Sequence, residues 1–276
     1  MTIRDLLTDA RARLSASPSA SLDAQVLLAE VLGVPRAYLL AHPDVTPTAD
    51  QVERFRGWVA RAAAGEPVAY IIGRRAFYDR EFMVTPAVLI PRPETELLLE
   101  QALDWAKPRP GGRAVDVGTG SGALAVTLAA LAPQLDVVAV DISPAALEVA
   151  RANAERHGVA DRVTFVQGDL LMPVLNQRFD LVMANLPYIA ADEVPTLAVS
   201  RYEPILALDG GADGLDLVRR LIAQIPLVCT PGALILLEIG AGQGAAALDI
   251  AQTLKPQHAA LLTDYAALDR IITITL

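Results

Sequence analysis

The spacing of hydrophobic residues divides the chain into segments of different character. In residues 1–64, apolar side chains recur every three or four positions, as on one face of a helix. Thr2 precedes the first such series, and Thr48 with Gln51 forms a capping-box pattern before another. The spacing predicts a small helical bundle, with helices near residues 2–14, 22–32, 38–40 and 48–62.

Residues 65–87 have a different pattern, rich in glycine, proline and aromatic residues. Gly65–Gly73 is expected to form short strands, and the aromatic residues at Phe77 and Phe82 suggest a β-hairpin. Pro91 and Pro93 then fix an extended segment before a helix over 97–105. We therefore expect a helical domain at 1–64, a linker with a β-hairpin at 65–87, and a larger domain at 88–276.

The larger domain alternates apolar strands with helices. Continuous apolar strands indicate a sheet covered on both faces, and the alternation predicts right-handed crossovers in a doubly wound, mostly parallel sheet. No helix is expected between the last two strands, so they should form a hairpin and make the final strand antiparallel. The fold class is α/β, with seven strands expected at 113–117, 137–140, 163–167, 179–184, 233–239, 260–263 and 270–276.

Composition and charge limit the classes of function. Hydrophobic residues make up 53% of the 276 residues, which supports a large core. The net charge of −9 and the absence of a Lys/Arg run disfavour general binding to nucleic acid, because phosphate contacts need cations. The only cysteine, Cys229, lies in an apolar context and is expected to be a buried, inert thiol.

The sequence also bears on the cellular location of the protein and on metal binding. No apolar run approaches the length that crosses a membrane, and residues 1–5 lack the apolar core of a secretory signal. We therefore expect a soluble, cytoplasmic protein. His42, His157 and His258 are isolated from one another, so no metal site is expected.

A glycine-rich stretch follows the first strand of the predicted sheet. Gly118, Gly120 and Gly122 alternate with Thr119 and Ser121, so the backbone can turn sharply and approach a ligand closely. Asp141 ends the second strand, where a carboxylate can accept both hydroxyls of a ribose. Together these features predict a nucleoside-containing cofactor. The alternatives are a tight turn for the glycines and a helix cap for Asp141.

The third strand ends at Asp169 and Leu170. A carboxylate and an apolar side chain there are suited to flank an adenine ring, one toward its exocyclic amine and the other along its face. By spacing alone, a helix cap explains Asp169 equally well.

The fourth strand leads into Asn185-Leu186-Pro187-Tyr188, where we expect the chemistry to occur. Asn185 is an amide, neither acid nor base, but its oxygen and the Leu186 carbonyl can hold a planar –NH2 group through two hydrogen bonds. Such bonds orient the nitrogen and favour the charge that develops on it during attack on a methyl group. Pro187 would restrict the conformation of this backbone, and the Tyr188 ring would pack against the flat face of the substrate. The alternative is an Asn-x-Pro turn at a strand end.

These motifs resemble those of class I, S-adenosylmethionine-dependent methyltransferases acting on planar nitrogens. Four further stretches are similar to those of the peptide chain release factor N5-glutamine methyltransferases, and the likeness extends over nearly the whole chain. They are residues 65–73, 89–96, 203–214 and 238–243.

The resemblance implies methylation of the glutamine in the Gly-Gly-Gln motif of bacterial release factors. It implies S-adenosyl-L-methionine as cofactor, bound by Gly118, Thr119, Gly120, Ser121, Gly122, Asp141, Asp169, Leu170 and Asn185. It places the catalytic site on Asn185, Leu186, Pro187 and Tyr188. Leu186 replaces the first proline of the family motif, although leucine supplies the same backbone carbonyl. The implied partner is a release factor, with no direct contact to nucleic acid or membrane, and we expect a monomer.

Three alternatives remain open. The sister activity on a glutamine of a ribosomal protein shares almost every motif. An N6-adenine methyltransferase would need a cationic groove or a target-recognition domain, and the sequence shows neither. A cofactor-binding protein without activity is suggested only by Leu186. The helical segment 1–64 is expected to recognise the substrate, because it would offer a surface separate from the catalytic domain.

Overall fold

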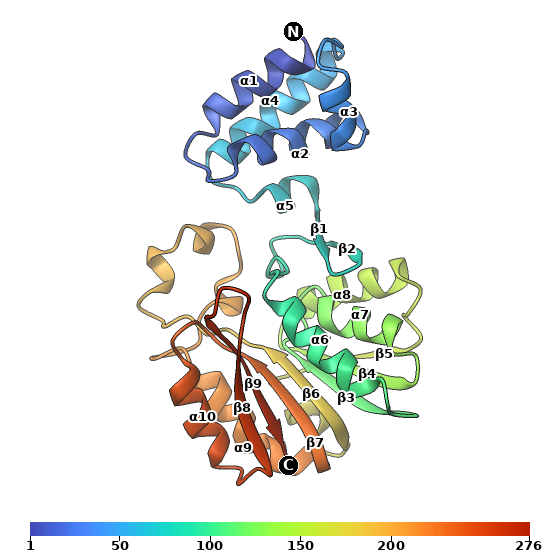
Figure 1. The fold of residues 1–276 in the computed structure, drawn as a ribbon, viewed down its shortest axis with the longest axis vertical. Helices are drawn as coiled ribbons and strands as arrows, with labels where there is room; N and C mark the ends of the chain where they lie inside the picture. The colour runs from blue at the N-terminus through green and yellow to red at the C-terminus, as the bar shows by residue number, and fades with distance from the viewer. The chain divides into compact units, whose positions relative to one another are not determined.

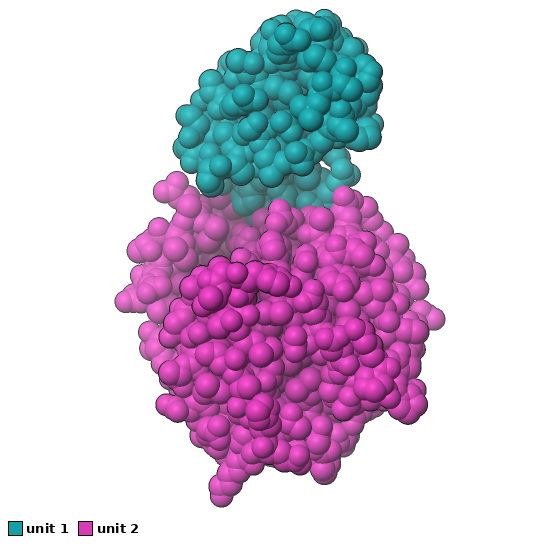
Figure 2. Space-filling model, in the orientation of Figure 1, with its two compact units in different colours: residues 1–74 teal, residues 75–276 magenta.

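The structure is a computed structural model that describes residues 1–276. The chain forms two compact units, Met1–Arg74 and Arg75–Leu276, which Figure 2 distinguishes by colour. The boundaries expected at residues 64 and 87 divide the chain more finely and stay predictions. None of the helices is both long enough and apolar enough to cross a membrane.

The first unit is the expected helical bundle. Thr2 with Asp5, and Thr48 with Gln51, each form a complete capping box, so both predicted helix starts are confirmed. Leu6, Leu28 and Phe55 lie in its core, each at most 1% exposed. Its helices are α1 (Ile3–Arg13), α2 (Ala20–Leu32), α3 (Arg36–Ala41), α4 (Ala49–Ala63) and α5 (Val68–Ile72).

Helix α5 corrects the expectation of short strands at Gly65–Gly73, which is wrong. Pro67 is the N-cap residue of α5, and Gly73 ends it in the left-handed region at φ 75°. Proline at the start and glycine just past the end also delimit a helix, so the two residues taken as turn signals were helix boundaries. Ile71 packs into the core of the bundle, which favours the helical turn.

The expected β-hairpin is present. It consists of β1 (Arg74–Phe77) and β2 (Arg80–Met83). Phe77 and Phe82 are buried in the core of the second unit. The Asn153 side chain accepts a hydrogen bond from the Met83 N–H at 2.7 Å and donates to the Ser121 carbonyl at 2.8 Å, which joins the hairpin to the glycine-rich stretch.

The second unit contains the predicted seven-stranded sheet, and the fold class is confirmed. The strand order is β5-β4-β3-β6-β7-β9-β8, and β9 is antiparallel to both its neighbours, as expected. The strands are β3 (Gly112–Val117), β4 (Leu135–Asp141), β5 (Val163–Gln167), β6 (Phe179–Asn185), β7 (Cys229–Glu238), β8 (His258–Thr263) and β9 (Asp269–Thr275).

Helices cover both faces of this sheet (Figure 1). Consecutive residues of β3 point to opposite faces, so Ala114 and Val115 belong to two different core clusters. The first cluster lies under α6 (Thr95–Ala106), α7 (Ala123–Leu131) and α8 (Pro144–Arg156), and the second under α9 (Asp216–Val228) and α10 (Gly244–Gln252).

The sheet creates a site where its strand order reverses. Strand β3 lies between β4 and β6, so the chain leaves β3 toward one edge and later returns on its other side. The loops after these strands diverge and leave a crevice, which is the usual place for a ligand in an open α/β sheet. The loop after β6 is long and contains short 3-10 helices at Val194–Thr196, Ala198–Arg201 and Ile205–Ala207.

Candidate functional site

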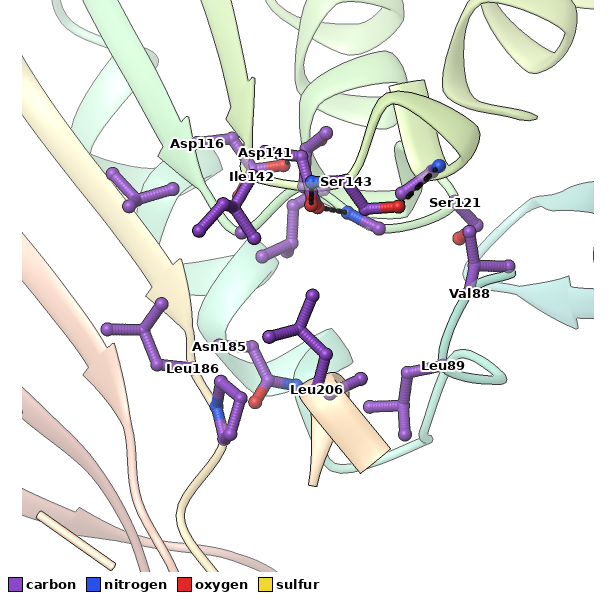
Figure 3. Close-up of a pocket in the computed structure, with 18 of the residues that line it drawn as sticks. Val88, Leu89, Asp116, Ser121, Asp141, Ile142, Ser143, Asn185, Leu186 and Leu206 are labelled. Atoms are coloured by element: carbon purple, nitrogen blue, oxygen red, sulfur yellow. Dashed lines mark hydrogen bonds between the residues drawn. The ribbon is translucent and has the colours of Figure 1, made fainter. Parts of the chain in front are cut away.

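A pocket of about 260 Å³ lies at the carboxyl ends of β3, β4 and β6. In Figure 3, one side of it carries Asp116, Asp141 and Ser143, and another carries Asn185, Leu186 and Leu206. The sequence-predicted residues that line this pocket are Gly118, Thr119, Gly120, Ser121, Asp141, Asp169, Leu170, Asn185, Leu186 and Pro187. Gly122 and Tyr188 do not line it. The roles assigned to all of these residues stay predictions.

The Asp141 carboxylate holds the glycine-rich loop in place. The Gly120 N–H donates to Asp141 Oδ2 and the Ser143 N–H donates to Oδ1, both at 2.9 Å. Burial raises the pKa of Asp141, and these backbone N–H groups act against the rise. Each carboxylate oxygen has a second lone pair, so the same group can also accept hydrogen bonds from ligand hydroxyls.

Gly122 has a packing role in the structure. It is the N-cap residue of α7 with φ 81°, a backbone conformation that favours glycine. A Cβ atom there would lie 3.2 Å from side-chain atoms of Ala150 and Val126. Gly122 thus allows α7 and α8 to approach closely behind the loop.

Asp116 lines the pocket and was not assigned a role from the sequence, although it begins the glycine motif. Its side chain is 1% exposed, and burial raises its pKa to about 7. Oδ2 accepts hydrogen bonds from the Thr119 hydroxyl at 2.7 Å and from the Ala125 N–H at 3.2 Å, whereas Oδ1 has no partner. A buried carboxyl oxygen without a partner favours a ligand that carries positive charge.

An apolar wall lies beside Asp141. Leu170 is buried, lines the pocket and has φ 50°, a strained conformation for leucine. Ile142 also lines the pocket and was missed from the sequence, although its place directly after Asp141 could have indicated it. Asp169 forms an ion pair with Arg220, and both lie on the lining. Ile142 and Leu170 together offer apolar contact to a flat ring.

The Asn185 side chain has a defined hydrogen bond. Its Nδ2 donates to the Thr95 hydroxyl oxygen at 2.9 Å, at the start of α6. Leu186 is 5% exposed and belongs to the core cluster beneath α9 and α10. One of its methyl carbons would lie 3.2 Å from a Cβ at Gly118. The leucine that replaces proline is therefore packed tightly between this core and the glycine loop.

The backbone after Asn185 is supported by the loop around residue 210. Gln243 Nε2 donates to the Tyr188 carbonyl at 2.9 Å, and the Ile189 N–H donates to the Leu208 carbonyl at 3.1 Å. Burial and the charge of Glu238 raise the pKa of Tyr188, and Arg270 acts in the opposite direction. Charged residues thus act on the pKa of the phenol, and Tyr188 itself is outside the pocket lining.

An ion pair joins two segments at the pocket. Arg92, on the lining, donates to Glu203 Oε1 at 2.7 Å, and the Glu203 side chain is 1% exposed. Arg92 belongs to the Pro-Arg-Pro segment, and Glu203 lies in the long loop after β6. The ion pair therefore connects these two segments at the pocket.

Gly214→Ala is expected to lower the methyl-transfer activity implied by the sequence motifs at least about tenfold without unfolding the protein. Gly214 has φ 76°, and a Cβ there would lie 2.2 Å from the Tyr188 carbonyl oxygen, so the segment 185–188 or the loop that carries Gly214 must shift. Steady-state kinetics with a thermal melt measure this effect. Gly158→Ala is the matched control, because it has φ 69° and open space around it. Equal activity in the two variants would contradict the expectation.

Comparisons with known proteins identify the family of the chain. The family described as PrmC N-terminal domain matches residues 5–73, and a methyltransferase domain family matches residues 108–208. A release factor glutamine methyltransferase of Moorella thermoacetica is 43% identical over 98% of this chain and 97% of the relative. One from Cereibacter sphaeroides is 41% identical over 99% of this chain and 98% of the relative.

A solved structure supports the fold independently. A methyltransferase from Pyrococcus furiosus has a TM-score of 0.54 at 18% identity, over 78% of this chain and 96% of that chain. The family resemblance inferred from the sequence motifs is confirmed by the curated relatives. The chain belongs to the release factor glutamine methyltransferases and is an S-adenosylmethionine-dependent enzyme.

Proposed function

We propose that this enzyme transfers a methyl group to the side-chain nitrogen (N5) of the glutamine in the Gly-Gly-Gln motif of peptide chain release factors. The observation that carries the proposal is the position of Asn185. Its amide lies at the carboxyl end of β6 and on the pocket that also contains the glycine loop and two buried acids. Family membership supplies the reaction class and the protein substrate.

The residues of the pocket fit S-adenosylmethionine. Asp141 would accept the ribose hydroxyls, Ile142 and Leu170 would contact the adenine, and the unpartnered Oδ1 of Asp116 favours a positively charged group. When bound, the cofactor supplies a methyl group activated by its sulfonium charge.

Asn185 and Leu186 would prepare the nucleophile. A carboxamide nitrogen is a poor nucleophile because its lone pair is delocalised into the carbonyl. The Asn185 side-chain oxygen and the Leu186 carbonyl would each accept one N–H of the substrate amide. Those two bonds hold the nitrogen toward the cofactor and stabilise the positive charge that grows on it until it releases a proton.

The test is methyl transfer from labelled S-adenosylmethionine to a purified release factor, a ribosomal protein mixture and duplex DNA. We expect label on the release factor, and we expect it to disappear when the Gly-Gly-Gln glutamine is replaced. Label on a ribosomal protein instead would support the proposed reaction but contradict the proposed protein substrate. Label on DNA, or none on any acceptor, would contradict the proposal.

The helical unit is proposed to recognise the release factor. Removing residues 1–73, which ends just before β1, should raise KM for intact release factor far more than KM for a short Gly-Gly-Gln peptide, because only the larger substrate reaches a second surface. Both KM values are measured after circular dichroism has confirmed that the truncated protein is folded. A similar rise for both substrates would contradict this role.

Two further proposals concern the cellular compartment and the oligomeric state of the enzyme. Release factors act with ribosomes, so we propose that the enzyme acts in the cytoplasm. We also propose that it acts as a monomer.

A further inference from the structure

Behind Asn185 lies a buried carboxyl group that the reaction described above does not use. Glu238 ends β7 and is the register partner of Asn185 across the β6–β7 ladder. Its side chain is 1% exposed, and neither of its carboxyl oxygens has a hydrogen-bond partner. A buried carboxyl group without partners is costly, so its position beside the pocket requires an explanation.

Thr95 lies between Glu238 and Asn185. The Thr95 hydroxyl oxygen accepts the hydrogen bond from Asn185 Nδ2, and Thr95 is only 5% exposed. An –NH2 group cannot accept a hydrogen bond, so the hydroxyl proton of Thr95 must point elsewhere. Burial raises the pKa of Glu238 to about 7, and the nearby Thr95 hydroxyl acts against that rise. Thr95 is therefore the donor available to Glu238.

The direction of these hydrogen bonds decides which way the Asn185 amide faces. If the Thr95 proton points to Glu238, the hydroxyl oxygen can only accept from Asn185. The Asn185 amide must then direct its –NH2 to Thr95 and keep its oxygen for the pocket. If the Thr95 proton were free to turn to Asn185, the amide could flip and present –NH2 to the substrate. A flipped amide would meet a substrate –NH2 donor to donor and could not hold it.

We propose that Thr95 and Glu238 are positioning residues that fix the Asn185 amide with its oxygen toward the substrate nitrogen. The Asn185 –NH2 donates to the Thr95 hydroxyl, and that hydroxyl would in turn donate to the Glu238 carboxylate. Hydrogen bonds in such a chain polarise one another, so the carboxylate also makes the Asn185 oxygen a better acceptor. This inference rests on the proposed function, in which Asn185 holds the substrate nitrogen.

The ionisation of Glu238 should appear in the rate. Once protonated, Glu238 can donate to Thr95, and the constraint on the Asn185 amide is lost. Three other charged groups act on the pKa of Glu238: Arg270 of β9, and Arg92 and Glu94 just before α6. The charge of Glu238 in turn raises the pKa of Tyr188, in the loop after β6. At saturating S-adenosylmethionine, whose positive charge keeps the nearby Asp116 ionised, we therefore expect kcat to fall as pH drops through about 7, and Glu238→Gln to remove that dependence.

The experiment compares Thr95→Val, Thr95→Ser and Glu238→Gln in the full-length enzyme with a release factor as substrate. Thr95→Val should lower kcat at least about tenfold, with KM for the release factor and Kd for S-adenosylmethionine within about twofold of wild type. Thr95→Ser, which keeps the hydroxyl, should restore most of kcat. Thr127→Val is the matched control, because Thr127 is also a buried helical threonine, but its hydroxyl has no partner.

The outcomes separate this inference from the proposed function. No methylation of the release factor by wild-type enzyme would overturn the function itself. An active wild type with an equally active Thr95→Val variant would overturn only the positioning role. So would a Thr95→Ser variant as impaired as Thr95→Val, or an unchanged pH profile in Glu238→Gln. The Glu238→Gln profile decides the matter if the valine variant fails to fold.

Discussion

Asn185→Ala should lower kcat for release factor methylation at least about 100-fold, the usual loss when one preorganised group that stabilises developing charge is removed. The Asn185 oxygen is the side-chain acceptor proposed to hold the substrate nitrogen. Alanine removes it and leaves the glycine loop and Asp141 in place, since neither is hydrogen-bonded to Asn185. Cofactor affinity should therefore stay within several-fold of wild type.

Single-turnover methyl transfer and calorimetric titration with S-adenosylmethionine measure these two effects separately. Asn176→Ala is the control, because Asn176 is exposed and outside the pocket lining. An Asn185→Ala enzyme with near wild-type kcat would show that the nitrogen is held elsewhere. Loss of cofactor binding together with kcat would instead indicate that Asn185 mainly shapes the cofactor pocket.

The pattern of hydrophobic residues predicted the fold well, because burial of each helix or strand sets that pattern over a few neighbouring residues. The central strands of the sheet are covered on both faces, so their residues are largely apolar, as at residues 181–184 of β6. Strand β5 begins and ends at the predicted residues 163 and 167. The antiparallel final strand followed from the missing helix before it. Segment 65–73 could not be assigned in the same way, because five helical residues between Pro67 and Gly73 are too short to show a period.

Several residues that line the candidate site could also be predicted from the sequence. Parallel strands bring their carboxyl ends to one edge, so Gly118, Asp141 and Asn185 had to be neighbours although they are distant in the chain. The sequence did not predict which way individual side chains point. Tyr188 follows directly after a lining residue, yet its own side chain lies outside the lining.

The two groups proposed to position Asn185, of which Thr95 lines the pocket and Glu238 lies behind the lining, could not be found from the sequence at all. Thr95 starts a helix and Glu238 ends a strand, and both positions have ordinary structural explanations. Only the register of β6 against β7 and the packing of α6 bring them to Asn185. Asp116 was missed for a different reason, because its unpartnered oxygen becomes informative only once its burial is known.

Asp141→Ala should weaken S-adenosylmethionine binding at least about 100-fold. The substitution removes the expected acceptor of the ribose hydroxyls, and hydrogen bonds to a charged group contribute about 1.5–3 kcal/mol each. It also leaves the N–H groups of Gly120 and Ser143 without the carboxylate that now holds them, so the glycine loop loses its support.

Calorimetric titration measures the loss for Asp141→Ala, and kcat at saturating cofactor should recover in part because Asn185 is unchanged. Asp136→Ala is the matched control, since Asp136 lies on the same strand, is exposed and does not line the pocket. Burial raises the pKa of Asp141, so wild-type affinity should fall as acid protonates this carboxylate, and Asp141→Ala should lack that contribution. An unchanged Kd in Asp141→Ala would show that the ribose is bound elsewhere and that the carboxylate serves the loop alone.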